Sequence, residues 1–235
     1  MATRAFIIAI ENYTKMQEGL NSTLPDTHKH ALGFRQWLID KQQLAPGDIF
    51  FCTDDPKLEG RTADATRSAI KQELKRFKDV ARDTTGDLFF YFSGHGFCYV
   101  DIDDLPTADV LLASDYVKRD ESGDACLKLD EIQRWLKFSL GSVTAPGSTR
   151  CGHFYFIDAC RNTISAKDIK VVDLGLAHEP SVRKKAPVYT LWSTTTGAVA
   201  NVAGGFPEAL LDGLNGKGKA KRFFEGSFTV LFDSL

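Results

Sequence analysis

Short runs of consecutive hydrophobic residues recur along the chain, and longer segments with a helical pattern separate them. Several of these runs are apolar at nearly every position rather than at every second one. That pattern is typical of strands buried on both faces in a parallel sheet. It predicts strands over Arg4–Ile10, Asp48–Cys52, Leu88–Ser93, Val110–Ser114, His153–Ile157, Val188–Trp192 and Phe228–Phe232.

Four of the intervening segments have hydrophobic residues at the spacing of an amphipathic helix. In the clearest, Ile70, Leu74 and Phe77 follow one another at intervals of four and three residues and therefore share one helix face. The four predicted helices fall within residues 26–42, 62–82, 127–140 and 206–214. Alternating strands and helices predict a single α/β domain, with a parallel sheet between helices and right-handed crossovers.

The composition fits a soluble globular protein. Hydrophobic residues make up 43% and charged residues 26% of the 235 residues, and the net charge of −2 provides no basic field for nucleic acid. No apolar run approaches the roughly 20 residues that cross a bilayer, and the first run is too short for a signal-peptide core. Five cysteines without a Cys-x-x-Cys pair are typical of free thiols. We therefore expect a cytoplasmic protein that binds neither nucleic acid nor a membrane.

Two predicted strands end in residues suited to nucleophilic chemistry. His95 stands between two glycines just past one strand, and Cys160 stands just past another. Ligands of open α/β sheets bind at the carboxyl ends of the strands, so the two side chains can meet if their strands are neighbours. The imidazole would then take the proton of the thiol, whose pKa is about 8.5 in a free cysteine, and return it to a leaving amine. The amides of Gly96 and Cys160 could donate to the oxyanion that forms.

Other interpretations of these residues stay open at this point. A cysteine after an apolar strand is often a small core residue, and Gly-His-Gly often forms a tight turn. Cys151, His153 and Cys160 could bind zinc, although their spacing is not that of a zinc finger and no second compact pair exists. Residues 213–221 come close to a phosphate-binding loop, but Ala220 stands where a hydroxyl is required.

The sequences around His95 and Cys160 resemble the motifs of caspases, metacaspases and their prokaryotic relatives. These sequences are "YFSGHG" and "FIDACRN", and the similarity continues in "AFIIAIENYTKM", "LPDTHKHALGFRQWL", "VYTLWSTTTGAVAN" and "GFPEALLDGL". The resemblance implies a three-layer sandwich, with a six-stranded, mostly parallel sheet flanked by helices. It also implies a cysteine endopeptidase with a His–Cys dyad. The domain would span residues 1–235 and could be the N-terminal part of a longer protein with regulatory domains.

The resemblance also indicates which residues bind the substrate. Asp158 precedes Cys160 by two residues, so strand alternation places both on one side. Metacaspases have aspartate at this position and accept arginine or lysine, whereas caspases have glutamine and accept aspartate. Asp26 would form a second acidic wall. Ser193 and Thr194 would line a cleft to which a peptide adds as a short strand. We expect cleavage of proteins or peptides after arginine, with lysine second because it cannot form a bidentate contact.

Calcium and proteolytic activation are further expectations from this resemblance. Metacaspases often need calcium, and the oxygen ligands that could hold it here are Asp101, Asp103, Asp104 and Asp109. A solvated acidic loop is the simpler interpretation, so we expect no resident cofactor or metal. The long segment before the predicted strand at 188–192 contains Arg183-Lys184-Lys185, a candidate cut site for a basic-specific protease.

Two other classes of function remain alternatives. One is a catalytically silent interaction module with a caspase fold, against which the intact His95 and Cys160 argue. The other is a nucleotide-binding domain, although no glycine fingerprint follows the first strand. His28, His30 and His178 are interpreted as surface or packing residues.

Overall fold

The structure is a computed structural model. It describes residues 3–14, 22–82, 86–100, 106–117, 125–140, 152–165, 171–176, 186–194, 205–217, 221–224 and 227–230. Three of the candidate calcium ligands, Asp101, Asp103 and Asp104, lie outside these residues, as does the cluster Arg183–Lys185.

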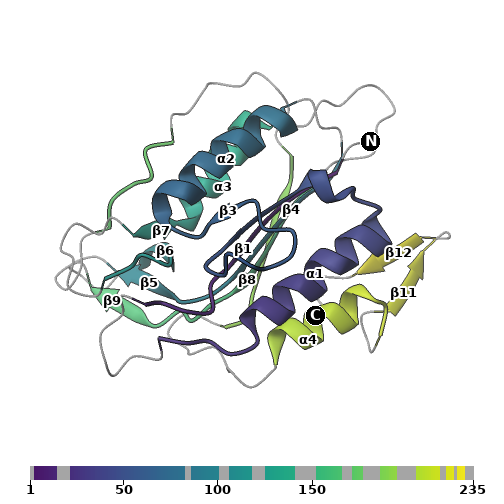
Figure 1. The fold of residues 1–235 in the computed structure, drawn as a ribbon. Helices are drawn as coiled ribbons and strands as arrows, with labels where there is room; N and C mark the ends of the chain where they lie inside the picture. The colour runs from purple at the N-terminus through teal and green to yellow at the C-terminus, as the bar shows by residue number, and fades with distance from the viewer. Residues whose placement is uncertain are drawn as a thin grey trace.

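A six-stranded sheet forms the centre of the fold (Figure 1). Its strand order is β10-β8-β4-β1-β2-β3, and every neighbouring pair is parallel. The expectation of a six-stranded parallel sheet is confirmed. The strands are β1 (Arg4–Ala9), β2 (Ile49–Thr53), β3 (Ala63–Asp64), β4 (Leu88–Ser93), β8 (His153–Asp158) and β10 (Val188–Trp192).

Four helices cover the two faces of this sheet, so the domain has three layers (Figure 1). On one side lie α1 (Thr27–Gln42) and α4 (Phe206–Leu214), and on the other lie α2 (Arg67–Ala81) and α3 (Leu129–Ser139). Strand alternation divides the core accordingly. Phe6 of β1 meets Phe77 of α2 edge-on with ring centroids 5.5 Å apart, whereas Ile7 belongs to the core under α1.

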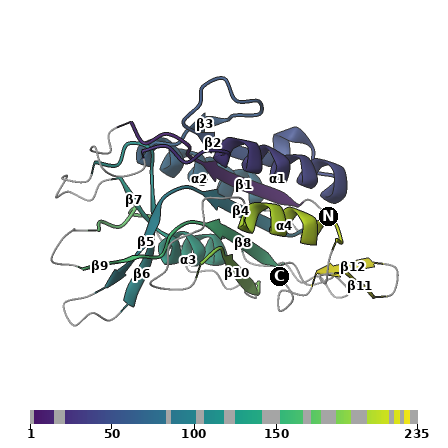
Figure 2. The ribbon, with the colours of Figure 1, turned by 90° about the horizontal axis from the view of Figure 1, so that it is seen from below.

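A second, smaller sheet lies at the carboxyl ends of the central strands (Figure 2). Its order is β7-β6-β5-β9, and only β5 and β9 are parallel. The predicted strand at 110–114 belongs to this sheet and not to the central one. An apolar run indicates that a strand is buried but not which strand it pairs with. The strands are β5 (Gly96–Val100), β6 (Pro106–Leu112), β7 (Cys126–Lys128) and β9 (Thr163–Ser165).

The last predicted strand also lies outside the central sheet. It corresponds to β12 (Ser227–Val230), which pairs with β11 (Lys221–Phe224) in a two-stranded antiparallel sheet. The sixth central strand is instead the two-residue β3, which is too short for a hydrophobic pattern to indicate it.

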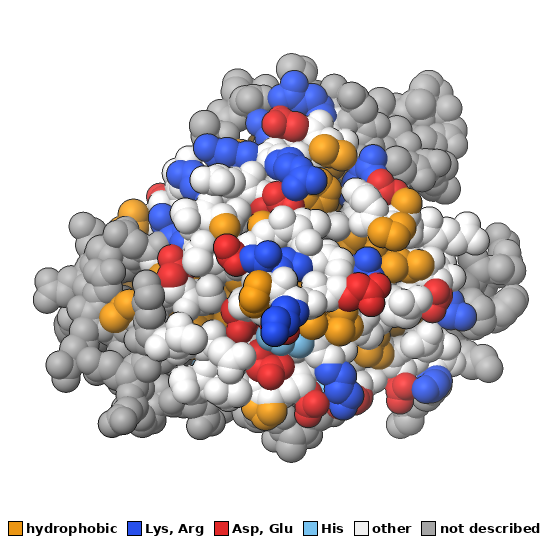
Figure 3. Space-filling model, viewed as in Figure 1, with side chains coloured by type: hydrophobic (Ala, Val, Ile, Leu, Met, Phe, Trp, Pro, Cys, Tyr) orange, Lys and Arg blue, Asp and Glu red, His pale blue; other side chains and the backbone are white. Residues whose placement is uncertain are grey.

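The surface carries charges of both signs. On the face shown in Figure 3, basic and acidic side chains are interspersed, and hydrophobic side chains form only small patches. Among the described residues, the exposed large hydrophobic side chains are those of Val80 and Tyr189. None of the described helices combines the length and the apolar character that a membrane span requires.

Phe77 provides a test of the packing between α2 and the sheet. Its side chain is fully buried and contacts Phe6 and Phe50. We expect Phe77→Ala to lower the free energy of unfolding by about 3–5 kcal/mol, because it leaves a cavity. Val80→Ala, on the same helix at a side chain that is 46% exposed, should change it by less than about 0.5 kcal/mol. Denaturant unfolding measures both, and equal losses would contradict this packing.

Candidate active site

The register between β4 and β8 places His95 and Cys160 at the same level of the sheet. Ser93 pairs with Asp158, and each candidate residue follows its strand's paired residue by two positions. The Gly94 amide donates to the Asp158 carbonyl at 3.1 Å, so the pairing between the two chain segments extends one residue beyond the end of β4. Both candidate residues are partly exposed, and their loops are neighbours at the carboxyl edge of the sheet.

The segments that follow the two candidate residues are also bound to each other. β5 pairs with β9, and the Cys98 amide donates to the Asn162 carbonyl at 2.8 Å. A Cβ atom at Gly96 would lie 3.0 Å from the Ala159 Cβ and 3.2 Å from the Cys160 carbonyl oxygen. Glycine at position 96 is therefore what lets the two loops approach this closely.

Asp158 is a partly buried carboxylate two residues before the candidate nucleophile. Its Oδ2 accepts a hydrogen bond from the Ser93 hydroxyl at 3.1 Å. Burial raises the pKa of Asp158, and the hydrogen bonds from Ser93 and Ser193 and the charge of His30 offset this only in part. Glu208 raises the pKa of Asp158 further. The carboxyl group therefore lies among polar groups from the sheet and from the helix layer above it.

His30 and Glu208 come from two different helices to this position. The His30 Nε2 of α1 lies 3.0 Å from the Glu208 Oε1 of α4, and the His30 side chain is buried. The interpretation of His30 as a surface or packing residue leaves out this pairing, and no sequence signal pointed to Glu208. Their approach to Asp158 depends on how α1 and α4 cross the sheet, which no local sequence pattern indicates.

Asp26, the predicted second acidic wall, lies at the start of α1. Its side chain is 58% exposed, and its Oδ1 lies 3.5 Å from the Lys29 Nζ. The charges that act most strongly on Asp158 are those of His30 and Glu208 instead. His30 is one helical turn after Asp26, and its amide donates to the Asp26 carbonyl at 2.9 Å. Of the side chains of α1, His30 is therefore the one whose charge acts on Asp158, and Asp26 as a second acidic wall stays a prediction.

Ser193 and Thr194, just after β10, hold the residue before Cys160. The Ala159 amide donates to the Ser193 Oγ at 3.2 Å, and the Ser193 hydroxyl lies 3.3 Å from the Ala159 carbonyl. The Thr194 hydroxyl donates to the same carbonyl at 3.2 Å. Besides any contact with a substrate, these two side chains therefore support the backbone from which Cys160 projects.

Asp109, the described candidate calcium ligand, is engaged in an ion pair. Its carboxylate accepts two hydrogen bonds from Arg161, both 2.9 Å long. The Arg161 guanidinium also lies over the Trp192 ring, 4.4 Å from its centroid. Within the part of the chain that the structure describes, no three acidic, histidine or cysteine side chains form a metal-binding group. A calcium ion at Asp109 would have to compete with Arg161.

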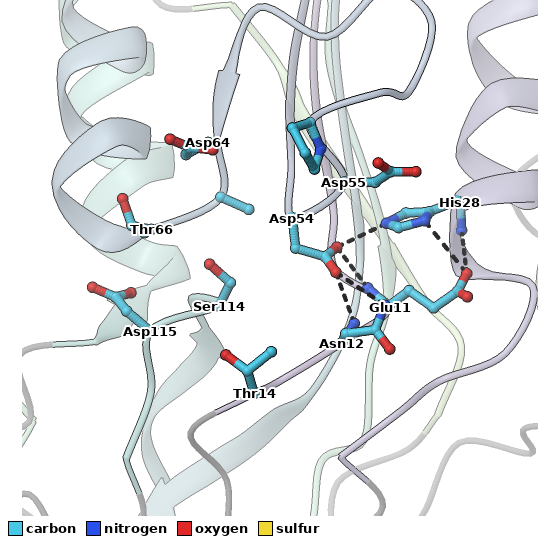
Figure 4. A pocket seen from close by; sticks show the side chains of 12 residues that line it. Glu11, Asn12, Thr14, His28, Asp54, Asp55, Asp64, Thr66, Ser114 and Asp115 are labelled. Atoms are coloured by element: carbon cyan, nitrogen blue, oxygen red, sulfur yellow. Dashed lines mark hydrogen bonds and ion pairs between the residues drawn. The ribbon is translucent and has the colours of Figure 1, made fainter.

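An acidic cavity of about 580 Å³ lies further along the same edge, beyond the ends of β1 and β2 (Figure 4). Asp54 accepts hydrogen bonds from the amides of Glu11 and Asn12, each 2.9 Å long, and lies 2.7 Å from the His28 Nε2. Burial acts against both charges, but these contacts outweigh it. The pKa of Asp54 is therefore lowered, and the pKa of His28 is raised. His28 is thus a member of an ion pair rather than a simple surface residue.

Comparison with known proteins identifies the family. The sequence model of peptidase family C14, described as the caspase domain, matches residues 2–228. The chain therefore belongs to the caspase-domain family of peptidases, as its motifs indicated. A relative from a Desulfuromonadales bacterium, named a probable protease, is 28% identical over 258 residues. The match covers all of this chain but only 29% of that relative's length.

The ion pair between His28 and Asp54 should make stability depend on pH. Because folding raises the pKa of His28 and lowers that of Asp54, the pair stabilises the fold fully between their unfolded pKa values, about 3.9 for aspartate and about 6.5 for histidine. This contribution is lost as pH rises through the folded pKa of His28. We expect His28→Gln to lower the free energy of unfolding by about 1 kcal/mol near pH 5.5, and by less near pH 9. Denaturant unfolding of both proteins at the two pH values measures this. The same loss at both would contradict it.

Proposed function

We propose that the protein is a cysteine endopeptidase in which Cys160 is the nucleophile and His95 transfers the proton. The observation that carries this proposal is the register of β4 and β8, because both residues follow the paired Ser93 and Asp158 by the same two positions. Membership of the caspase-domain peptidase family supports the reaction class.

The proposed reaction proceeds through an acyl-enzyme. His95 takes the proton of the Cys160 thiol as the sulfur attacks the carbonyl carbon of the scissile peptide bond. The amides of Gly96 and Cys160 donate to the resulting oxyanion. His95 then gives the proton to the leaving amine, and the C–N bond breaks. Water attacks the thioester with His95 as base, the acid product leaves, and the thiol is regenerated.

Cys160→Ala should abolish peptide cleavage, and His95→Ala should lower kcat by several orders of magnitude, because the nucleophile loses its proton acceptor. Turnover of a fluorogenic peptide measures both, and circular dichroism checks that each variant is folded. Near-normal turnover in either variant would contradict the dyad. A folded wild-type protein that neither cleaves peptides nor reacts with a thiol-directed peptide electrophile at Cys160 would instead favour the silent interaction module.

We further propose that the substrate has arginine, or second best lysine, before the cut. Asp158 supports this because a partly buried carboxylate can be satisfied by a guanidinium through two parallel hydrogen bonds. Glu208 adds a second negative charge near it, and acidic side chains would be repelled. Asp26 is exposed and forms an ion pair with Lys29, so it would contribute less to the preference for arginine.

The substrate would add as a strand beside β10. This strand lies at the edge of the central sheet, so its outer backbone groups have no partner strand among the described residues. Ser193 and Thr194 follow it directly. The segment beyond them, residues 195–201, lies outside the described residues. Strand addition along that segment therefore stays a prediction, as does cleavage at Arg183–Lys185.

Asp158→Asn should lower kcat/KM for an arginine peptide by about 10- to 100-fold, the scale of one hydrogen bond to a charged group. It should leave a matched citrulline peptide almost unchanged, and Asp26→Asn should have a smaller effect on the arginine peptide. Because burial raises the pKa of Asp158, the preference for arginine should decline as pH falls through that pKa. Fluorogenic peptides that differ only at this residue measure these effects. A wild-type preference for aspartate, or full arginine selectivity in both variants, would defeat the proposal.

A further inference from the structure

Tyr13 lies against His95 although 82 residues separate them in the chain. Its side chain is completely buried, and its ring centroid lies 4.7 Å from that of the imidazole. The Tyr13 hydroxyl accepts a hydrogen bond from the His95 amide at 2.8 Å and donates one to the Leu112 carbonyl at 3.2 Å. Tyr13 therefore contacts both the ring and the backbone of the candidate general base.

The Tyr13 hydroxyl takes the place of one hydrogen bond in the ladder between β5 and β6. Gly96 pairs with Leu111, so His95 and Leu112 are the next opposite pair. In a regular antiparallel ladder every second opposite pair exchanges two hydrogen bonds, and the His95–Leu112 pair is one of that kind. One is present here, because the Leu112 amide donates to the His95 carbonyl at 2.9 Å. The other is relayed through the Tyr13 hydroxyl, which keeps the His95 amide apart from the Leu112 carbonyl.

Gly94 makes room for this inserted hydroxyl. A Cβ atom at Gly94 would lie only 2.6 Å from the Tyr13 oxygen, closer than such atoms approach in proteins. Burial raises the pKa of the Tyr13 phenol well above its ordinary value, so the hydroxyl stays protonated and keeps its donor for Leu112 at neutral pH. The first glycine of the Gly-His-Gly motif is thus explained by a side chain from the segment that follows β1.

Asp54, at the acidic cavity in Figure 4, holds the segment that carries Tyr13. The carboxylate of Asp54 accepts hydrogen bonds from the amides of Glu11 and Asn12, the two residues before Tyr13. The Tyr13 amide donates to the Ser22 carbonyl at 2.7 Å. Asp54, which follows β2, therefore holds the backbone of the two residues before Tyr13. The segment that precedes α1 holds the amide of Tyr13 itself.

We propose that Tyr13 is a positioning residue that sets where His95 stands relative to Cys160, and that Asp54 holds Tyr13 in place. The inference rests on the proposed function, because the position of His95 matters for activity only if His95 acts on Cys160. Without the hydroxyl, the His95 amide and the Leu112 carbonyl either stay unpaired or close directly on each other. Either change removes the contact that fixes the His95 backbone, so the imidazole is no longer held in one position.

The test compares Tyr13→Phe with Tyr155→Phe. The Tyr155 hydroxyl is buried and has no hydrogen-bond partner among the described residues, so its removal controls for the loss of a buried hydroxyl away from His95. With a fluorogenic arginine peptide, Tyr13→Phe should lower kcat by about 10- to 100-fold, the cost of a misplacement of about 1 Å, with little change in KM. Tyr155→Phe should match the wild type in both.

The pH profile of Cys160 alkylation by iodoacetamide gives a second measurement that needs no peptide substrate. The other cysteines in the described part of the chain are buried, and Cys160→Ala supplies the background. We expect His95→Ala to move the inflection of the alkylation rate, and Tyr13→Phe to move it in the same direction. Tyr155→Phe should leave it unchanged.

Each outcome separates this inference from the proposed function. If His95→Ala moves the alkylation profile but Tyr13→Phe behaves like Tyr155→Phe in profile and kcat, the positioning role is wrong and the dyad stands. If His95→Ala has no effect on the profile or on turnover, the proposed function itself fails. Should Tyr13→Phe not fold, Asp54→Asn replaces it, because asparagine keeps one of the two acceptor oxygens. For Asp54→Asn, a loss of kcat smaller than that expected for Tyr13→Phe, at unchanged KM, supports the proposal. An unchanged kcat in Asp54→Asn overturns it.

Discussion

The pairing of β4 with β8 in a single register is the constraint on which the candidate site depends. A slip of one residue would turn every side chain of one strand to the other face and shift Cys160 relative to His95. Aromatic rings on both faces resist such a slip. Phe90 lies against Tyr155 on one face, with ring centroids 5.3 Å apart, and Phe89 against Phe154 on the other, 5.5 Å apart. The packing of the core thus sets the geometry at the edge.

The order of the strands places the candidate site at the point where the sheet reverses its direction of growth. The chain builds β1, β2 and β3 outwards in one direction and then returns to place β4 on the other side of β1. Ligand sites of open α/β sheets lie at such a reversal, because the loops on its two sides diverge and leave a crevice. Here Tyr13, in the segment after β1, contacts His95, in the loop after β4. The Asp54–His28 ion pair lies on one side of the reversal and the candidate dyad on the other.

The polar groups around Asp158 come from the sheet and from one helix layer. Hydroxyls from Ser93 of β4 and from Ser193, just after β10, donate hydrogen bonds, and the charged groups are His30 of α1 and Glu208 of α4. A carboxylate in such surroundings is stabilised only in part, since burial still raises its pKa. In this chain the end of β8 thus places a partly buried carboxyl group two residues before the candidate nucleophile.

The sequence by itself determined the parallel sheet, the helices that cover it and the two strand ends that carry His95 and Cys160. These features are visible locally, because strands buried on both faces are apolar throughout and amphipathic helices repeat at a fixed interval. Only the tertiary structure decided that residues 110–112 join a second sheet, that His30 and Glu208 meet near Asp158, and that Tyr13 contacts His95. Those contacts depend on strand register and on how helices cross the sheet, and both are set by packing between segments distant in the chain.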